Sequence, residues 1–318
     1  MKKLIFILSL FLSFPVFGQV AFMSGGYTAE AGYCAEYQAV YDAYTTKPDA
    51  ATAAIWNTCV ETWVANGEWA TKDVIYVYAA HTNGAGEALK NWKNPGTFDA
   101  TAYLAPTHTA NQGILGNGTT QYIDCGGWVS STHGVNYVQN SASQIIYVRT
   151  DIAANTWHGV WTSAGTKGTL ISPRYGNDKV YFGINDAGQA NYANANGSGM
   201  YVNTRTAAAV KVVYKNKVLI FTSDHVSTGV PTHSPYCLAY NADGVATAHR
   251  ADQVSLYAFG AGMTQTHVDN FTDPFEVAMD ALGTGIIAMA DHLEELILLH
   301  YLALKIRIEK YENNIETH

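Results

Sequence analysis

Two helical patterns and one apolar run open the chain. Apolar and aromatic positions recur every three or four residues in 33–46 and again in 48–66, where Gly67 follows as a stop. These periods predict two short helices packed as a hairpin. The next segment, 74–80 (VIYVYAA), is apolar throughout, which predicts a fully buried strand.

From about residue 84 the pattern changes to that of strands. Short apolar runs alternate with Gly, Asn, Thr and Ser, and tight turns are expected at Lys215–Asn216 and Asp243–Gly244. Many short strands with polar turns indicate a sandwich or barrel rather than βαβ units. The candidate strands are 122–125, 144–149, 157–162, 169–173, 179–184, 199–203, 211–214, 217–222 and 253–260.

The end of the chain returns to a helical period. Apolar positions from Val268 to Leu282 form one stripe, ended by Gly283, but Asp273–Pro274 resembles a helix cap and would divide the stretch into two helices. A further helix is expected at 286–312, acidic early and basic late. Its broad Leu/Ile stripe either packs on its own domain, forms a homo-oligomer, or contacts a membrane surface.

The first residues have the pattern of a secretory signal. Lys2 and Lys3 precede the apolar stretch Leu4–Phe17, and Gly18–Gln19 supply small or polar residues for cleavage. We therefore expect a signal peptide at 1–19 and a secreted, extracellular or virion location. A buried first strand or a retained anchor is the alternative.

Four cysteines follow this signal, namely Cys34, Cys59, Cys125 and Cys237. An even number in a secreted chain permits disulfides, and the neighbouring helical patterns favour a Cys34–Cys59 pair. Buried free thiols are the alternative interpretation.

Composition narrows the function classes. Hydrophobic residues make up 48% of the 318 positions, which excludes a disordered chain. Charged residues make up only 14%, against about 25% in an average soluble domain, and the net charge is −8. No run of Lys or Arg exceeds two residues, so nucleic acid is not an expected partner.

Several phrases occur in an order that resembles a known family. They are ALKNWKNPG at 88–96, APT at 105–107, GNGTTQYID at 116–124 and FGAGMT at 259–264. Their order resembles concanavalin A-like (LamG-like) jelly-roll domains of phage and prophage structural proteins, over about residues 48–283. The resemblance implies a mainly β, jelly-roll β-sandwich with an N-terminal helical hairpin and C-terminal helices.

This resemblance also implies an organisation and a role. The domains would be a signal peptide (1–19), a helical leader with one strand (20–83), the jelly roll (84–283) and a C-terminal helix (284–318). The protein would be a phage-type structural or binding protein. Its loops would recognise cell-surface glycan or a partner structural subunit.

Catalytic patterns are missing from the sequence. A jelly-roll glycosidase needs two carboxylates on one strand face, as in a Glu-x-Asp-x-x-Glu array. The Asp residues of the body are instead scattered, and Asn196–Gly199 lacks the spacing of a nucleophile elbow. We therefore expect no enzymatic activity. A secreted polysaccharide-active enzyme, either a glycoside hydrolase or a lyase, is the alternative.

Metal and cofactor sites have little support. The eleven histidines lack helical pairing and the cysteines lack metal-ligand spacing, so no cofactor is expected. Ca²⁺ bound near Asn241–Gly244 is a weaker idea, because a plain hairpin turn explains this segment equally well.

Aromatic residues in the middle of the chain are the candidate ligand-binding residues. Sugar rings stack on exposed aromatic side chains, while polar side chains bind the hydroxyl groups. Two indoles four residues apart on a strand share a face, although both would also fit a core. The candidates are Trp157, Trp161, Arg174, Tyr175 and Tyr192.

The signal sequence gives a direct prediction about the mature chain. When the protein is expressed with its native start and exported, its N-terminus should lie near Val20 rather than at Met1. Mass spectrometry of the purified N-terminal peptide measures this. An intact Met1–Gln19 segment in the exported protein would reject cleavage.

Overall fold

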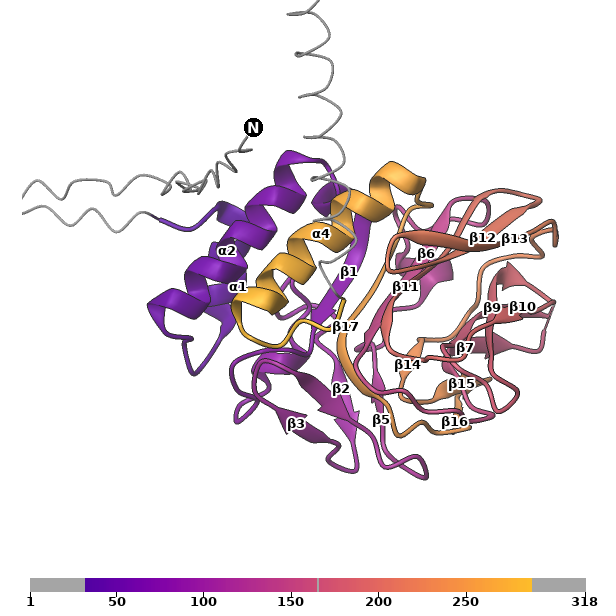
Figure 1. Ribbon diagram of the computed structural model, residues 1–318, viewed down its shortest axis with the longest axis horizontal. Coiled ribbons are helices and arrows are strands. Elements are labelled where there is room, and N and C mark those ends of the chain that lie inside the picture. Colours follow the sequence, from indigo (N-terminus) through magenta and orange to yellow (C-terminus); the bar gives the residue numbers. More distant parts are fainter. Residues whose placement is uncertain (1–31, 165, 288–318) are drawn as a thin grey trace, which may run out of the picture. The chain divides into compact units, whose positions relative to one another are not determined.

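The computed structural model describes residues 32–164 and 166–287. The signal peptide expected at 1–19 and almost all of the helix expected at 286–312 lie outside these residues. The described residues form a mainly β structure in which two sheets pack face to face (Figure 1). The expected β-sandwich is therefore confirmed.

The first sheet has three long helices on one face, and we call it the helix-backed sheet. Strand β17 lies near its centre, between β6 on one side and β1 and β4 on the other. Its strands, in spatial order, are β13 (Val218–Ser223), β12 (Val210–Lys215), β11 (Gly199–Ala207), β6 (Ala142–Val148), β17 (Gln253–Gly260), β4 (Gly113–Leu115) and β3 (Thr107–Thr109), with β1 (Lys72–Val77) paired to β17.

The second sheet, which we call the outer sheet, packs against the other face of the helix-backed sheet. Among the described strands all pairings are antiparallel except that of β15 with β7. The strands, in spatial order, are β10 (Ala190–Ala193), β9 (Lys179–Asp186), β8 (Lys167–Ser172), β7 (His158–Thr162), β14 (Tyr236–Cys237), β5 (Tyr122–Asp124) and β2 (Thr101–Tyr103), with β15 (Tyr240–Ala242) beside β7 and β16 (Val245–Thr247) beside β15.

Two hydrophobic clusters result from this layering. One lies between the sheets, and the other lies between the helix-backed sheet and its helices. Burial of this sheet on both faces explains why β6 is buried along its whole length and why 74–80 reads as one apolar run. The buried polar side chain of Gln144 in β6 is satisfied by a 2.8 Å hydrogen bond to the Tyr257 hydroxyl. The helices are α1 (Ala35–Ala43), α2 (Ala50–Ala65) and α4 (Gln265–Ala281), with shorter turns η1 (Trp69–Thr71), η2 (Glu87–Leu89) and α3 (Ser130–His133).

Local sequence signals explain where the hairpin helices and two β-turns lie. The Asp49 side chain caps α2 by accepting a 2.7 Å hydrogen bond from the Thr52 amide. The hairpin turn expected at Asp243–Gly244 is confirmed between β15 and β16, whereas the turn between β12 and β13 lies at Asn216–Lys217, one residue later than expected. In both, the two turn residues have positive φ, as a two-residue turn of this kind requires.

Helix α4 corrects the idea of a break at Asp273. It is one helix that contains Pro274, and it begins after Thr264. Proline lacks an amide hydrogen, so the carbonyl of Asn270 loses its usual helical partner. The Asn66 side-chain amide of α2 donates to that carbonyl at 2.8 Å, and the Trp63 indole donates to the next carbonyl, that of Phe271, at 2.9 Å. The end of α2 therefore satisfies the acceptor that the proline leaves without its helical donor, and it also binds the neighbouring carbonyl.

The favoured Cys34–Cys59 disulfide is wrong, because all four cysteines are free. The Cys34 amide donates to the side chain of Asn57, so the start of α1 faces that side of α2. Residues two apart on a helix point about 200° apart, and Cys59 accordingly faces α4 instead.

The link between the helices gives a prediction about stability. Asn66→Ala should lower the free energy of unfolding by about 1–2 kcal/mol, because the Asn270 carbonyl then lacks a partner. Urea denaturation measures the change. Thr58→Ala on the exposed side of the same helix is the matched control and should change stability by less than about 0.5 kcal/mol. Equal effects in the two variants would contradict this role of Asn66.

Candidate functional site

The outer sheet carries the two tryptophans that the sequence singled out. Trp157 lies directly before β7 and Trp161 lies within it, and both are half-buried, whereas His158 and Val160 between them are buried. Alternation along a strand therefore directs both indoles to the face of the outer sheet that the other sheet does not cover. Neither indole is a core residue.

Trp157 forms the centre of a compact aromatic group. Its ring centroid lies 5.5 Å from that of Tyr175 and 5.8 Å from that of Tyr181, and the two tyrosines are 4.8 Å apart. The Asn177 side-chain amide donates to the Tyr181 hydroxyl at 3.0 Å. We call Trp157, Tyr175 and Tyr181 the Trp157 platform. Sequence reasoning missed Tyr181, although the alternation of β9 would have placed it beside the outward-facing Lys179.

Arg174 borders this platform and joins two loops. Its guanidinium binds both carboxylate oxygens of Asp151 at 2.9 Å and Oδ1 of Asp178 at 2.8 Å. The hydrogen bonds that Arg174 donates to Asp178 and Asp151 raise the pKa of Arg174. Burial by itself would raise the pKa of Asp151, but hydrogen bonds from the Gly197 amide and from Arg174 leave that pKa lowered. Arg174 is thus a positioning residue whose charge is already paired.

Trp161 and Tyr192 do not belong to the platform, which corrects the expectation of one five-residue site. Trp161 lies flat over Gly168 of β8, where an added Cβ would come within 2.5 Å of the ring. Tyr192 is 46% exposed, but its cross-strand partner Val180 points into the core, so Tyr192 lies on the other face. Its ring packs at 5.6 Å from Phe221.

A buried group beneath the outer sheet resembles a catalytic arrangement. His158 accepts a 3.0 Å hydrogen bond at Nδ1 from the Leu238 amide, and its Nε2 donates to Asp252 at 3.0 Å. The Cys237 sulfur lies 3.7 Å from the same Nδ1. All three side chains are fully buried, and burial raises the pKa of the Cys237 thiol and lowers that of His158. The group therefore holds β7, β14 and β17 together without reaching a substrate.

Carboxyl groups suited to donate a proton lie away from the platform. In the described part of the chain burial raises the pKa of Asp186 and of Glu276. Asp186 is buried against Lys211 and Arg205, at 2.6 and 2.9 Å, and Glu276 accepts from the Tyr147 hydroxyl. No group of three potential metal ligands occurs among the described residues.

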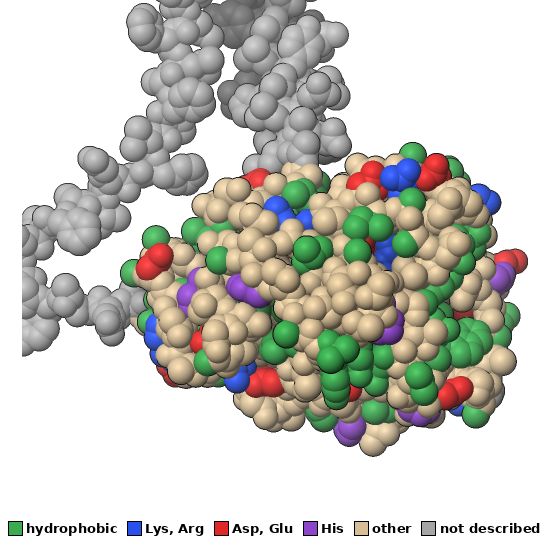
Figure 2. All heavy atoms as spheres, turned by 90° about the horizontal axis from the view of Figure 1, so that it is seen from below, with side chains coloured by type: hydrophobic (Ala, Val, Ile, Leu, Met, Phe, Trp, Pro, Cys, Tyr) green, Lys and Arg blue, Asp and Glu red, His purple; other side chains and the backbone are tan. Residues whose placement is uncertain are grey.

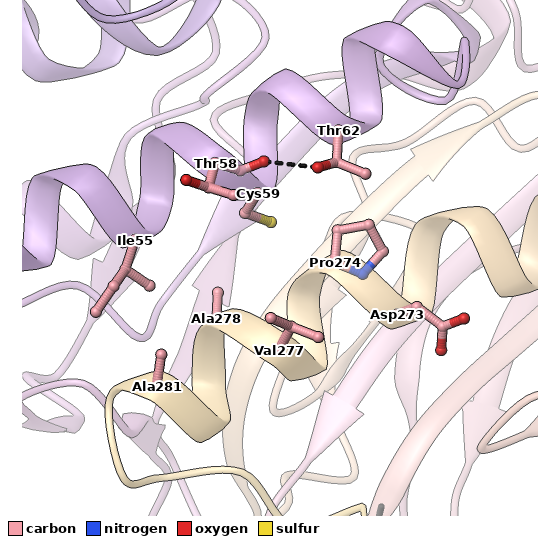
Figure 3. Close-up of a pocket in the computed structure, with 9 residues that line it drawn as sticks. All are labelled: Ile55, Thr58, Cys59, Thr62, Asp273, Pro274, Val277, Ala278 and Ala281. Carbon is pink, nitrogen blue, oxygen red and sulfur yellow. Dashed lines mark hydrogen bonds between the residues drawn. The ribbon is translucent and has the colours of Figure 1, made fainter. Parts of the chain in front are cut away.

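Two concave sites lie elsewhere. An apolar groove of about 360 Å³ runs between α2 and α4, where Ile55 and Cys59 approach Val277, Ala278 and Ala281 (Figure 3). No described partner occupies it.

The second is a polar crevice of about 310 Å³ beside β1, lined in part by Lys93 and His133. Burial, together with the charge of Lys72, lowers the pKa of Lys93 to about 8, while its ammonium group is held by the Trp69 carbonyl and ring. Neither site includes the Trp157 platform, which is an open surface.

The comparisons with known proteins concern the fold. No protein-family model and no curated protein matches the chain. A mutant of Trypanosoma rangeli sialidase with trans-sialidase activity matches with a TM-score of 0.47 at 13% identity, over 74% of this chain and 40% of the sialidase chain. The chain thus spans well under half of that enzyme.

Two further solved structures match with similarly low TM-scores and identities. Domain 4 of AbnA, a GH43 extracellular arabinanase from Geobacillus stearothermophilus in complex with arabinotriose, matches at 15% identity with a TM-score of 0.38, over 64% of this chain and 98% of the domain. The botulinum neurotoxin serotype D binding domain matches at 7% identity with a TM-score of 0.43, over 64% of this chain and 52% of that chain. Values this low assign no activity or ligand.

The expectation that the protein is not an enzyme is nevertheless contradicted and is withdrawn. The matched structures include sialidases and a domain of an arabinanase, and these proteins are enzymes.

The described helices include none that combines the length and the apolar character needed to cross a membrane.

The buried histidine gives a prediction about pH. Because the folded pKa of His158 is lowered while the unfolded chain titrates near 6.5, the unfolded state binds more protons below that pH. His158 should therefore cost about 1 kcal/mol of stability between pH 7.5 and 5.5. Urea denaturation of His158→Gln should show a correspondingly smaller loss, whereas the exposed His225→Gln should keep the wild-type loss. Equal pH dependence in all three proteins would contradict a neutral buried His158.

Proposed function

We propose that this protein binds carbohydrate on the outer sheet, through the Trp157 platform. The observation that supports it most is a group of three half-buried rings whose centroids lie within 5.8 Å of one another. These rings lie on a face that no other layer of the described chain covers. Aromatic rings offer flat apolar faces to the C–H faces of sugars, and they lose little side-chain entropy on binding. Asn155 and Asn177 at the rim supply polar groups for hydroxyls.

The loops that carry these rings are held in place before any ligand arrives. Asn155 accepts a 3.1 Å hydrogen bond from the Gly176 amide, and Arg174 joins Asp151 to Asp178 across the same loops. A site whose residues are already ordered loses less entropy on binding. This rigidity favours recognition by a preformed surface.

The biological role, the location and the partners of the protein are proposals from the sequence alone. The phage-type role rests on the ordered motifs between residues 88 and 264, and the secreted location rests on residues 1–19. A partner structural subunit and a homo-oligomer through the C-terminal helix likewise stay predictions.

A polysaccharide-active enzyme is the second candidate. One observation favours it, since the ionised carboxylates of Asp151 and Asp178 both bind Arg174 next to the platform, where they suit the role of base or nucleophile rather than that of proton donor. Paired carboxylates are the usual catalytic groups for glycosidic bonds. Release of reducing ends from a polysaccharide panel, abolished by Asp151→Asn, would support this candidate. Binding without release would reject it.

The binding proposal predicts the effect of removing the central ring. Affinity gel electrophoresis against soluble neutral polysaccharides, including arabinan, xylan, mannan and mixed-linkage glucan, should identify a retarding polymer. Trp157→Ala should weaken that binding about tenfold, because one aromatic stacking contact contributes about 1 kcal/mol or more.

Tyr192→Ala is the matched control, because Tyr192 is an exposed aromatic residue on the other face of the same sheet. It should leave binding unchanged. An absence of retardation by every polymer, or equal losses in both variants, would overturn the proposal.

A further inference from the structure

A second row of rings lies on the same face of the outer sheet. The centroids of Tyr103 and Tyr122 are 4.5 Å apart with nearly parallel planes, and Tyr122 lies 4.7 Å from Tyr236. Tyr103 is 41% exposed and Tyr122 is half-buried. Their strand neighbour Ile123 points into the core, so alternation turns Tyr122 and its cross-strand partner Tyr103 outward.

Two of the motifs noted in the sequence build this row. The side-chain amide of Gln121 donates to the carbonyls of Leu104 and Ala105, at 2.9 and 3.0 Å. These two residues have φ values of 57° and 50°, a left-handed conformation that is costly for side chains of this kind. The segment APT at 105–107 and the segment GNGTTQYID at 116–124 thus meet where Tyr103 and Tyr122 are presented.

The second row continues from the first. The Trp157 amide donates to the carbonyl of Ala248, and the next residue, His249, lies 6.0 Å from Tyr122. In strand order the rings extend from β9 through β8, β7, β14 and β5 to β2. Five strand spacings of about 4.8 Å correspond to about 24 Å.

We propose that Tyr103 and Tyr122, which pack against the buried Tyr236, form a second sugar-stacking platform, and that the two platforms together bind one extended, unbranched polysaccharide chain across the strands. This inference rests on the proposed carbohydrate binding and names its substrate class. A single sugar would occupy one platform, whereas a longer chain would contact both and gain affinity from the second contact without a second binding event.

Charges along the two platforms favour a neutral chain. Arg174 and the outward-facing Lys179 are the cations beside the first platform; Arg174 binds Asp151 and Asp178, and Lys179 donates to the Asn191 side chain. At the second platform the Asp124 carboxylate accepts from Ser234 and from the Gly127 amide. The three carboxylates outnumber these two cations, so a uronate or sialate would meet a net negative charge, which is unfavourable. Figure 2 shows one face of the molecule, on which charged side chains are scattered among uncharged ones, in keeping with the 14% of charged residues in the chain.

The test compares oligosaccharide lengths. Isothermal titration calorimetry uses the trisaccharide and the hexasaccharide of whichever neutral polymer retards the wild-type protein. The hexasaccharide should bind about tenfold more tightly than the trisaccharide. Tyr103→Ala and Tyr122→Ala should remove this gain and leave trisaccharide binding unchanged, whereas Trp157→Ala should weaken both ligands.

The controls separate this inference from the function on which it rests. Tyr122→Phe keeps the ring and should retain the higher affinity for the hexasaccharide. Because Tyr103 is exposed, Tyr103→Ala tests the second platform even if Tyr122→Ala fails to fold. Equal affinity for both lengths in the wild type, or an unchanged gain in Tyr103→Ala, would overturn the second platform while carbohydrate binding stands. If Trp157→Ala changes the affinity for neither oligosaccharide, both the second platform and the proposed carbohydrate binding are overturned.

Discussion

The packing of aromatic side chains between the helices and the helix-backed sheet is the interaction on which the arrangement depends. Trp63 stacks on Phe271 at 4.6 Å, and Trp56, Phe275 and Tyr147 continue this contact to the sheet. Burial of large aromatic residues is a major favourable contribution to folding. Because the helices cover one face of the helix-backed sheet and the outer sheet covers its other face, the far face of the outer sheet is the sandwich face left open. Aromatic residues there have no further layer of the described chain to pack against.

The proposed site follows from that asymmetry. Rings on a solvated sheet face would ordinarily be replaced by polar residues, since such a sheet needs apolar positions on one face only. Here polar side chains from the loops hold the rings in place instead, as Arg174 does between Asp151 and Asp178 and Gln121 does at Leu104 and Ala105. The result is an apolar surface with fixed geometry. A buried His158–Asp252 pair below it joins β7 of the outer sheet to the start of β17 in the helix-backed sheet.

Some features could be read from the sequence because they depend on neighbours along the chain. The hairpin between β12 and β13 follows from two β-branched runs around Asn216, and the end of α4 follows from Gly283. That Trp157 and Trp161 share a face follows from period-two alternation, whereas the structure decided that this face is the outward one. Short strands such as β2 and β14 were missed, because two or three residues give no period. Tyr181 was missed because its importance depends on Trp157, which comes from another strand.

The sequence by itself determined the element types, the mainly β class and the identity of the aromatic residues, since periodicity, turn residues and composition are local properties. Only the tertiary structure decided which rings meet. It grouped Trp157 with Tyr175 and Tyr181, and it excluded Tyr192, whose strand partner Val180 faces the core. It also left the cysteines unpaired and kept α4 continuous through Pro274. Strand register and the side of a helix that faces a neighbour depend on packing between distant segments, and no local pattern encodes that packing.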